Sequence, residues 1–149
     1  MALDDIYKEV ILDHYKNPRN KREVPGAELT CSKNNPLCGD EITVFVHEVD
    51  GKLVDVGFLG QGCSISQSSA SMMTEAVADT SRNEAGEMIG RIRAMMAGEV
   101  QPDEETFGEL VALKGVVKYP VRIKCAVLPW DVLQEALAGK GEAEGSAAH

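Results

Sequence analysis

Two short runs of alternating apolar residues, separated by a turn signal, are the strongest constraint on how this 149-residue chain folds. Such alternation is the pattern of strands that bury one face. The dipeptide Asp50-Gly51 lies between the runs and is typical of a tight hairpin turn. The sequence therefore predicts an antiparallel ribbon. Its alternating apolar residues are Ile42, Val44 and Val46 in the first run and Val54, Val56 and Phe58 in the second.

A further strand is expected just before this ribbon, at residues 27–33. The residues that follow it, Asn34, Asn35 and Pro36, are typical of a bend. After the ribbon, Gly60 and Gly62 end the extended pattern immediately before Cys63. A helical pattern begins at the next residue, so Cys63 is expected near a helix N-terminus.

Apolar residues at helical spacing account for most of the remaining chain. We expect Gly98 to cap the third of the helices, Gly115 to stop the fourth, and Pro129 to kink or divide the last. No internal repeat or linker is evident, so we expect one domain over residues 1–138, followed by a small, polar and disordered tail at 139–149. The expected helices span residues 3–17, 64–78, 83–98, 104–114 and 120–137.

The charge balance argues against several classes of partner. Lys and Arg number 15 against 24 Asp and Glu, a formal net charge of −9, so nucleic acid would be repelled. No apolar run approaches the ~20 residues of a membrane span, and the first ten residues lack the pattern of a signal peptide. We therefore expect a cytoplasmic protein without a membrane partner. The basic segment KNPRNKRE is an exception, readable as a solvated loop or as a docking patch.

Three cysteines lie in distinctive local contexts. Cys38 lies between a proline two residues earlier and a glycine in NPLCGD, Cys63 follows a glycine loop in GQGCSIS, and Cys125 has a basic flank in RIKCAVLPW. In a reducing compartment such residues are thiols or metal ligands rather than a disulfide framework. Separate buried cysteines that act only as small hydrophobic residues are the alternative. Cys31 has no such context, and we expect it to be a buried thiol outside any site.

With Asp40, these three cysteines supply the four ligands that zinc commonly takes. Three thiolates and one carboxylate around a divalent ion leave a charge of about −2, which Arg122 and Lys124 could offset. A carboxylate is a harder and more easily displaced ligand than sulfur, so Asp40 predicts an exchangeable site. If a ligand leaves, a cysteine is free to attack a persulfide, which is the chemistry of a sulfur acceptor.

Four segments resemble the IscU/NifU/SufU family of iron-sulfur cluster assembly proteins. They are DHYKNPRN, NPLCGD, GQGCSISQSSASMM and RIKCAVLPW, in the family's order, and the resemblance covers nearly the whole chain before the tail. It implies an α+β fold in which a small antiparallel three-stranded sheet packs with helices. It also implies a metal site at Cys38, Asp40, Cys63 and Cys125 and a cysteine desulfurase partner.

Within the family the chain is most similar to the SufU type. Lys124 stands where the IscU type has a histidine, and the region 81–119 is longer than in IscU. The resemblance to SufU implies Zn²⁺ at the site and transfer of sulfur from a SufS-type desulfurase to Cys38, with iron-sulfur acceptor or scaffold proteins downstream. If the chain instead worked like the IscU type, the resemblance would make Cys125 the first choice for receiving sulfur. The chain would then be a sulfur carrier rather than a free-standing enzyme.

Two alternatives remain open from the sequence. In the first, an iron-sulfur cluster is assembled at the same four residues and transferred to other proteins. In the second, zinc only holds the fold together. Nucleophilic serine chemistry in SISQSSAS is not expected, because no histidine base is patterned beside it; His14 and His47 are expected to be structural or solvated.

Overall fold

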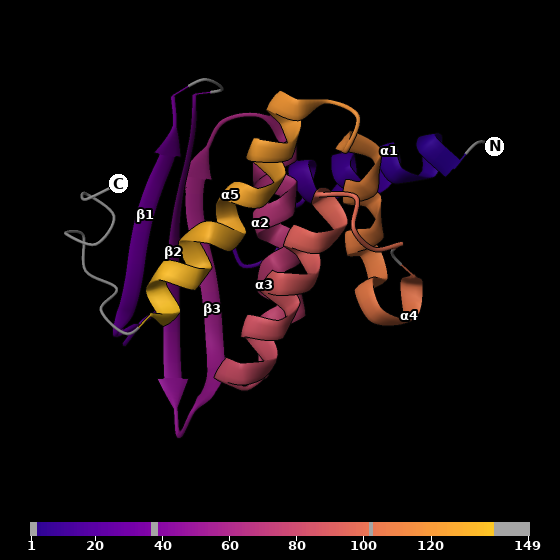
Figure 1. Cartoon of the computed structure of the whole chain (residues 1–149). Helices are drawn as coiled ribbons and strands as arrows, with labels where there is room; N and C mark the ends of the chain where they lie inside the picture. Colours follow the sequence, from indigo (N-terminus) through magenta and orange to yellow (C-terminus); the bar gives the residue numbers. More distant parts are fainter. Residues whose placement is uncertain (1–2, 37–38, 102, 139–149) are drawn as a thin grey trace.

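The computed structural model describes residues 3–36, 39–101 and 103–138. They form a three-stranded antiparallel sheet in the order β1-β2-β3, with the helices gathered on one side of it (Figure 1). This confirms the predicted α+β class. The elements are α1 (Leu3–Lys16), β1 (Leu29–Asn35), β2 (Asp40–Val49), β3 (Lys52–Gln61), α2 (Ser64–Val77), α3 (Arg82–Met96), α4 (Glu104–Phe107), the 3-10 helix η1 (Gly108–Val116) and α5 (Pro120–Leu137).

The predicted hairpin is confirmed between β2 and β3. Asp50 and Gly51 have φ values of 54° and 80°, the left-handed backbone that the turn requires. The predicted burial of Val54 is wrong, because the pairing shifts between His47 and Glu48 and leaves Val54 without a partner residue. This bulge reverses the alternation, so that Leu53 is fully buried while Val54 is exposed.

The first strand lies two residues later than predicted. Asn34 and Asn35, which the sequence places in a bend, pair with Glu41 and Asp40 at the start of β2. The bend begins instead at Pro36. Because backbone pairing continues this far, β1 delivers the chain directly to the segment that leads into Asp40.

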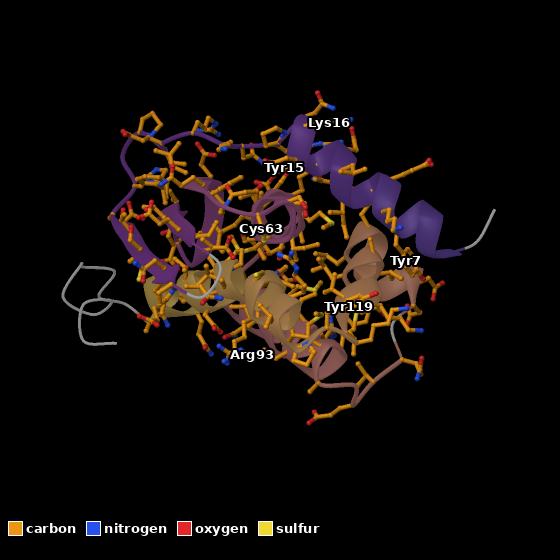
Figure 2. The ribbon with its side chains drawn as sticks, turned by 90° about the horizontal axis from the view of Figure 1, so that it is seen from above. Tyr7, Tyr15, Lys16, Cys63, Arg93 and Tyr119 are labelled. Carbon is orange, nitrogen blue, oxygen red and sulfur yellow. The ribbon has the colours of Figure 1, made fainter. Side chains whose placement is uncertain are left out.

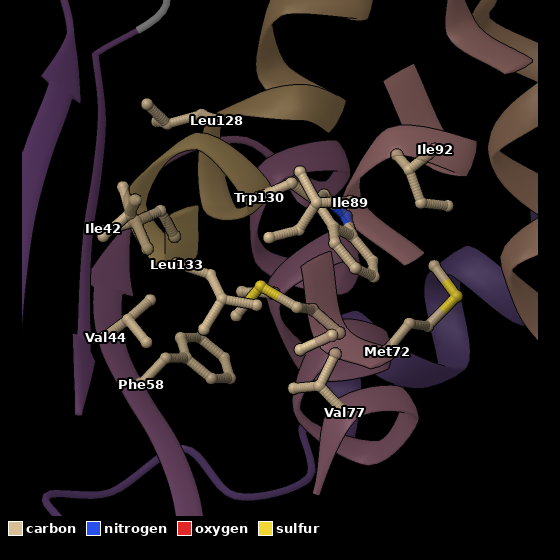
Figure 3. Packing of buried hydrophobic residues seen from close by; sticks show 14 of the residues in the cluster. Ile42, Val44, Phe58, Met72, Val77, Ile89, Ile92, Leu128, Trp130 and Leu133 are labelled. Atoms are coloured by element: carbon tan, nitrogen blue, oxygen red, sulfur yellow. The ribbon is translucent and has the colours of Figure 1, made fainter. Parts of the chain in front are cut away.

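One hydrophobic cluster joins the sheet to the helices. α5 lies across β1 and β2, while α2 packs against β3, α5 and α1. Figure 3 shows how the buried side chains of the sheet meet those of the helices. Over the described residues the sheet and the helices thus share one continuous core. The labelled members are Ile42, Val44 and Phe58 from the sheet, Met72 and Val77 from α2, Ile89 and Ile92 from α3, and Leu128, Trp130 and Leu133 from α5.

Four of the five predicted helices end within two residues of their predicted bounds, whereas the fourth along the chain does not. α3 begins with a capping box in which Ser81 and Glu84 satisfy each other's backbone N–H groups. Gly98 follows the last turn with a φ of 77°, as expected of a helix end. The single helix predicted at 104–114 is wrong: α4 stops at Phe107, and Gly108, with a φ of 56°, starts a 3-10 helix that runs through Gly115.

The last helix, α5, is not divided at Pro129. Proline has no N–H to continue the helical ladder, but contacts with α2 hold the segment. The Ser69 hydroxyl donates to the Ala126 carbonyl at 2.6 Å, and the Trp130 indole N–H donates to Ser69 Oγ at 3.1 Å. None of the described helices has the length and apolar character needed to cross a membrane. The predicted tail, 139–149, lies outside the described residues.

Candidate metal centre

Three of the four predicted ligands come together from separate elements. Asp40 is the first residue of β2, Cys63 immediately precedes α2, and Cys125 lies in the second turn of α5. One ligand atom of each lies within 4.8 Å of the others. Figure 2, a view from above, labels Cys63, which lies at the N-terminus of α2. Cys38, the fourth predicted ligand, lies outside the described residues.

Asp40 and Cys63 are held together by direct contacts. The Cys63 backbone N–H donates to Asp40 Oδ1 at 2.8 Å, and Cys63 Sγ lies 3.7 Å from Asp40 Oδ2. The Asp40 side chain is fully buried. Burying a carboxylate is costly without compensation, and the N–H groups and positive dipole of a helix N-terminus provide some of it. The same contacts point both Asp40 oxygens toward the first turn of α2.

Gly62 makes this close approach possible. Its φ of 139° is unfavourable for residues with side chains, and a Cβ at this position would lie 2.2 Å from Asp40 Oδ1. Gly39, on the other side of Asp40, has a φ of 70°, but a Cβ added there would have no atom of the described residues within 4 Å. Gly62 is therefore needed for space as well as for backbone conformation, and Gly39 for conformation alone.

Cys125 completes the described part of the centre from α5. It is fully buried, and its Sγ lies 3.6 Å from the Val121 carbonyl oxygen. Arg122, one turn earlier on the same face, lies beside both sulfurs. The negative charge of a Cys63 thiolate, followed by contacts with Cys125, raises the pKa of the Arg122 guanidinium above its ordinary value. Arg122 is thus placed to offset negative charge at the centre.

Lys124, the second predicted charge-supporting residue, is not brought to the centre. It is exposed, and within the described parts of the chain the structure gives it no hydrogen bond or ion pair. The reason is helical geometry: residue 122 is three positions from Cys125 and shares its face, whereas residue 124 is adjacent and points to another side.

The donor set fits a thiophilic divalent ion. Two sulfurs and one carboxylate converge, those of Asp40 and Cys125 buried and that of Cys63 half-buried, and thiolate with carboxylate is a combination that zinc accepts. Oxygen alone would suit magnesium or calcium, but the two sulfurs do not. The residues present can therefore hold zinc, with one coordination position left for a further ligand such as Cys38.

Cys31 takes no part in this centre. It is buried in β1 opposite Val44, and its Sγ lies 3.9 Å from Glu135 Oε1. Burial, with the charge of Glu135, raises the pKa of the Cys31 thiol above its ordinary value. A thiol in this setting is unreactive.

One contact was missed by the sequence analysis. The His14 ring is fully buried, with Nδ1 2.8 Å from Ser71 Oγ and Nε2 2.7 Å from Glu109 Oε1. Ser71 Oγ also accepts the Arg19 backbone N–H at 2.9 Å, and Ser71 is itself fully buried. Because Ser71 is buried and has no access to a substrate, it cannot act as a nucleophile. The hydrogen bonds from His14 to Ser71 and Glu109 instead connect α1 to α2 and η1. No local pattern could reveal them, because the partners are 57 and 95 residues apart.

A groove of about 1030 Å³ adjoins the centre. Its apolar walls come from α1, η1 and the start of α5; Tyr7 and Tyr119, which line it, are both labelled in Figure 2. Several of its residues are exposed despite being apolar, and its described lining includes cations but no acidic residue, in a chain whose net charge is −9. The exposed apolar residues are Leu12, Tyr119 and Val121, and the cations are Lys8, Lys118 and Arg122.

The basic segment identified in the sequence is partly neutralised within the fold. Arg19 pairs with Asp13 and Arg22 with Asp55, each at 2.7 Å. The Asn20 carbonyl accepts the Phe58 N–H at 3.0 Å, so the segment runs along the free edge of β3. These contacts make the segment a loop that is tied to the fold, which favours the loop over the docking patch.

The chain matches known proteins over most of its length. The family described as NifU-like N terminal domain matches residues 6–138. The zinc-dependent sulfurtransferase SufU of Bacillus subtilis (strain 168) is 45% identical over 137 residues, which cover 91% of this chain and 92% of that protein. The iron-sulfur cluster assembly scaffold protein IscU of Streptococcus pyogenes serotype M1 is 39% identical over 142 residues, covering 95% and 89%.

A solved structure shares the fold. The crystal structure of FiSufU from the thermophilic Fervidobacterium islandicum AW-1 superposes with a TM-score of 0.82 and 36% sequence identity, covering 91% of this chain and 99% of that one. The similarity therefore extends over the sheet, the helices and the segments that carry Asp40, Cys63 and Cys125.

Proposed function

Because this chain belongs to the NifU-like N terminal domain family, we propose that it is a zinc-dependent sulfur acceptor in iron-sulfur cluster assembly. The observation that carries the proposal is the convergence of Asp40, Cys63 and Cys125 from three separate elements. A relative with 45% identity is a zinc-dependent sulfurtransferase, which agrees with this donor set.

In this proposal Asp40, Cys63 and Cys125 hold zinc together with Cys38, which is two residues from Asp40 in the sequence. Bound zinc would keep the coordinating thiols deprotonated and in place. Arg122 would offset part of the resulting negative charge, since its guanidinium lies beside both described sulfurs. Lys124 has no such contact, so we assign the charge-supporting role to Arg122.

The sulfur transfer itself is an exchange between thiolate and persulfide. The Cys38 thiolate attacks the terminal sulfur of a persulfide on the donor protein, forming a new S–S bond at Cys38. The S–S bond of the donor breaks, and its cysteine leaves as a thiolate. Charge and atoms balance without an external oxidant or reductant. The product is a Cys38 persulfide, which a downstream cluster-assembly protein can accept.

The donor in this proposal is a SufS-type cysteine desulfurase. The groove beside the centre supports docking of a protein there, because its exposed apolar walls and cationic lining are suited to an acidic segment with apolar side chains. Free thiols are needed at every step, so we place the reaction in the cytoplasm.

A desulfurase assay tests the function. Turnover of cysteine by a SufS-type enzyme is measured with and without the zinc-loaded protein. We expect stimulation by the wild type, none by Cys38→Ala, and normal stimulation by Cys31→Ala, because Cys31 lies in the core. Turnover that is unchanged by the wild type, or stimulated normally by Cys38→Ala, would contradict the proposal.

Assembly of an iron-sulfur cluster at the same residues is the second candidate. It is favoured by the relative from Streptococcus pyogenes, which is named as a scaffold protein. Anaerobic supply of iron and sulfide should then produce a cluster chromophore that can be transferred to an apo-protein. A protein that retains zinc and never gains this absorption would argue against the scaffold role.

A zinc site that only holds the fold is disfavoured by the size of the core. The hydrophobic cluster extends through the sheet, α2, α3, η1 and α5 without the metal centre. We therefore expect the metal-free protein to stay folded and to lose only its sulfur-acceptor activity. Unfolding upon chelation would instead support a structural site.

A further inference from the structure

The serine-rich start of α2 contains four fully buried serines. Three of them bond to groups other than the proposed metal ligands. Ser69 bonds to α5, Ser71 bonds to His14, and the Ser68 hydroxyl donates to the Ile65 carbonyl at 3.2 Å. The fourth, Ser66, is the one whose described contacts lie at the centre itself.

Ser66 contacts one metal ligand at two points. Its hydroxyl donates to the Cys63 carbonyl oxygen at 3.2 Å, and its Oγ lies 3.9 Å from Cys63 Sγ. The Cys63 N–H is already bound to Asp40. The Cys63 carbonyl also accepts the Gln67 backbone N–H at 3.2 Å. The backbone of Cys63 is therefore fixed on both sides, by Asp40 at its N–H and by Ser66 and Gln67 at its carbonyl, while its sulfur lies beside Asp40 and Ser66.

Gln67 in turn holds Ser66. Its Nε2 donates to Ser66 Oγ at 3.1 Å, and the residue is only 3% exposed. Across the described residues, Gln67 Oε1 is the buried side-chain nitrogen or oxygen that lacks a hydrogen-bond partner. A buried amide with an unsatisfied oxygen is costly and calls for an explanation. We explain this buried amide by its other end, because its Nε2 holds the hydroxyl of Ser66 in place.

We infer that Ser66, held by Gln67, is a positioning residue that orients Cys63 as a metal ligand. This inference rests on the proposed function, because it assumes that Cys63 binds the metal. Groups that orient a ligand from behind typically change metal affinity by about 10- to 100-fold when removed. Of the four buried serines of α2, Ser69 and Ser71 thus connect α2 to other helices, Ser68 bonds within α2, and Ser66 positions the metal ligand Cys63.

Zinc affinity measured against a chromophoric chelator tests this role. Ser66→Ala should weaken zinc binding about tenfold or more, whereas Ser68→Ala should change it by less than about twofold. Ser68 is a matched control because it is equally buried on the same helix and donates to a carbonyl three residues earlier, as Ser66 does. Gln67→Leu should also weaken binding, since it removes the group that holds Ser66.

Substitution of cobalt for zinc adds a spectroscopic measurement that a change in stability alone would not alter. The sulfur-to-cobalt absorption should change in Ser66→Ala and match the wild type in Ser68→Ala. The inference is overturned if Ser66→Ala binds zinc like the wild type, or if Ser68→Ala loses as much affinity. Should Ser66→Ala fail to fold, Gln67→Leu decides by the same criteria.

Cys63→Ser separates this inference from the proposed function. If Cys63→Ser leaves zinc affinity unchanged, the proposed ligand set is wrong, and the positioning role falls with it. If Cys63→Ser abolishes tight binding but Ser66→Ala does not weaken it, the ligand set stands and the positioning role alone is wrong.

Discussion

The Cys63 backbone N–H donates to one oxygen of the Asp40 carboxylate at 2.8 Å, while the sulfur of Cys63 lies 3.7 Å from the other. The same side chain thus caps the start of α2 and faces the metal centre. These two tasks can be separated, because the first needs an oxygen acceptor and the second needs a charged ligand.

Asp40→Asn should keep the fold and weaken metal binding. The amide oxygen can still accept the Cys63 N–H, but a neutral amide is a poorer zinc ligand than a carboxylate. We expect zinc affinity to fall at least about tenfold, with the thermal midpoint of the metal-free protein near the wild-type value. Asp40→Ala should lower that midpoint as well, because the buried N–H loses its partner at a cost of about 1–3 kcal/mol. Wild-type zinc affinity in Asp40→Asn would exclude Asp40 as a ligand.

Gly62→Ala should damage both stability and metal binding. The new Cβ would lie 2.2 Å from Asp40 Oδ1, and the backbone φ of 139° is strained for alanine. Gly51→Ala is the control, since its φ of 80° adds strain but no atom of the described residues lies within 4 Å of the added carbon. Thermal melts should show a loss in both variants, and zinc titration a loss in Gly62→Ala alone. Equal zinc affinities in the two variants would contradict the close packing at Gly62.

Arg122→Ala and Lys124→Ala should differ in zinc affinity, although both remove one positive charge near Cys125. Arg122 lies beside the sulfurs of Cys63 and Cys125, and the thiolate charge raises the pKa of its guanidinium. Its loss should weaken zinc binding about five- to tenfold, while Lys124→Ala should have little effect. Zinc titration of the two variants at the same ionic strength checks this. An equal loss in both would show that only the overall charge matters.

An ion pair remote from the centre should make stability depend on pH. Two hydrogen bonds from Arg82, both at 2.7 Å, lower the pKa of Glu48 below its ordinary value of 4.5. Since the folded pKa is the lower one, this pair stabilises the protein above pH 4.5, and the stabilisation is lost as the pH falls through the folded value.

Glu48→Gln should therefore destabilise the protein at neutral pH by only ~1 kcal/mol, because the pair is partly exposed to solvent. The difference from the wild type should shrink in acid. Thermal midpoints of both proteins across this pH range give the comparison. A difference that is independent of pH would rule out the ion pair as its cause.

Local signals predicted the parts of the structure that depend on neighbouring residues. The turn at Asp50-Gly51 follows from backbone conformation, and the place of Cys63 before a helix follows from the glycines that precede it. Both could be read from the sequence because the determining groups lie within a few positions. The bulge that exposes Val54 could not, since it is set by pairing with His47 and Glu48 across the hairpin.

The candidate site also has features that local sequence predicts and features that depend on long-range packing. Its residue types and local contexts indicated metal binding, and the structure brings Asp40, Cys63 and Cys125 together. The difference between Arg122 and Lys124 depends on which face of α5 meets α2, and that is a property of packing. The role of Ser66 was hidden for another reason, because its run of serines has no periodicity that separates one buried hydroxyl from the next.

Sulfur transfer to Cys38 can be tested by peptide mass spectrometry of the zinc-loaded protein after incubation with a SufS-type desulfurase and cysteine. We expect an added sulfur atom on the peptide that contains Cys38, and its absence when the desulfurase is left out. Added sulfur on the Cys63 or Cys125 peptide instead, or on none of them while the desulfurase is active, would contradict this expectation.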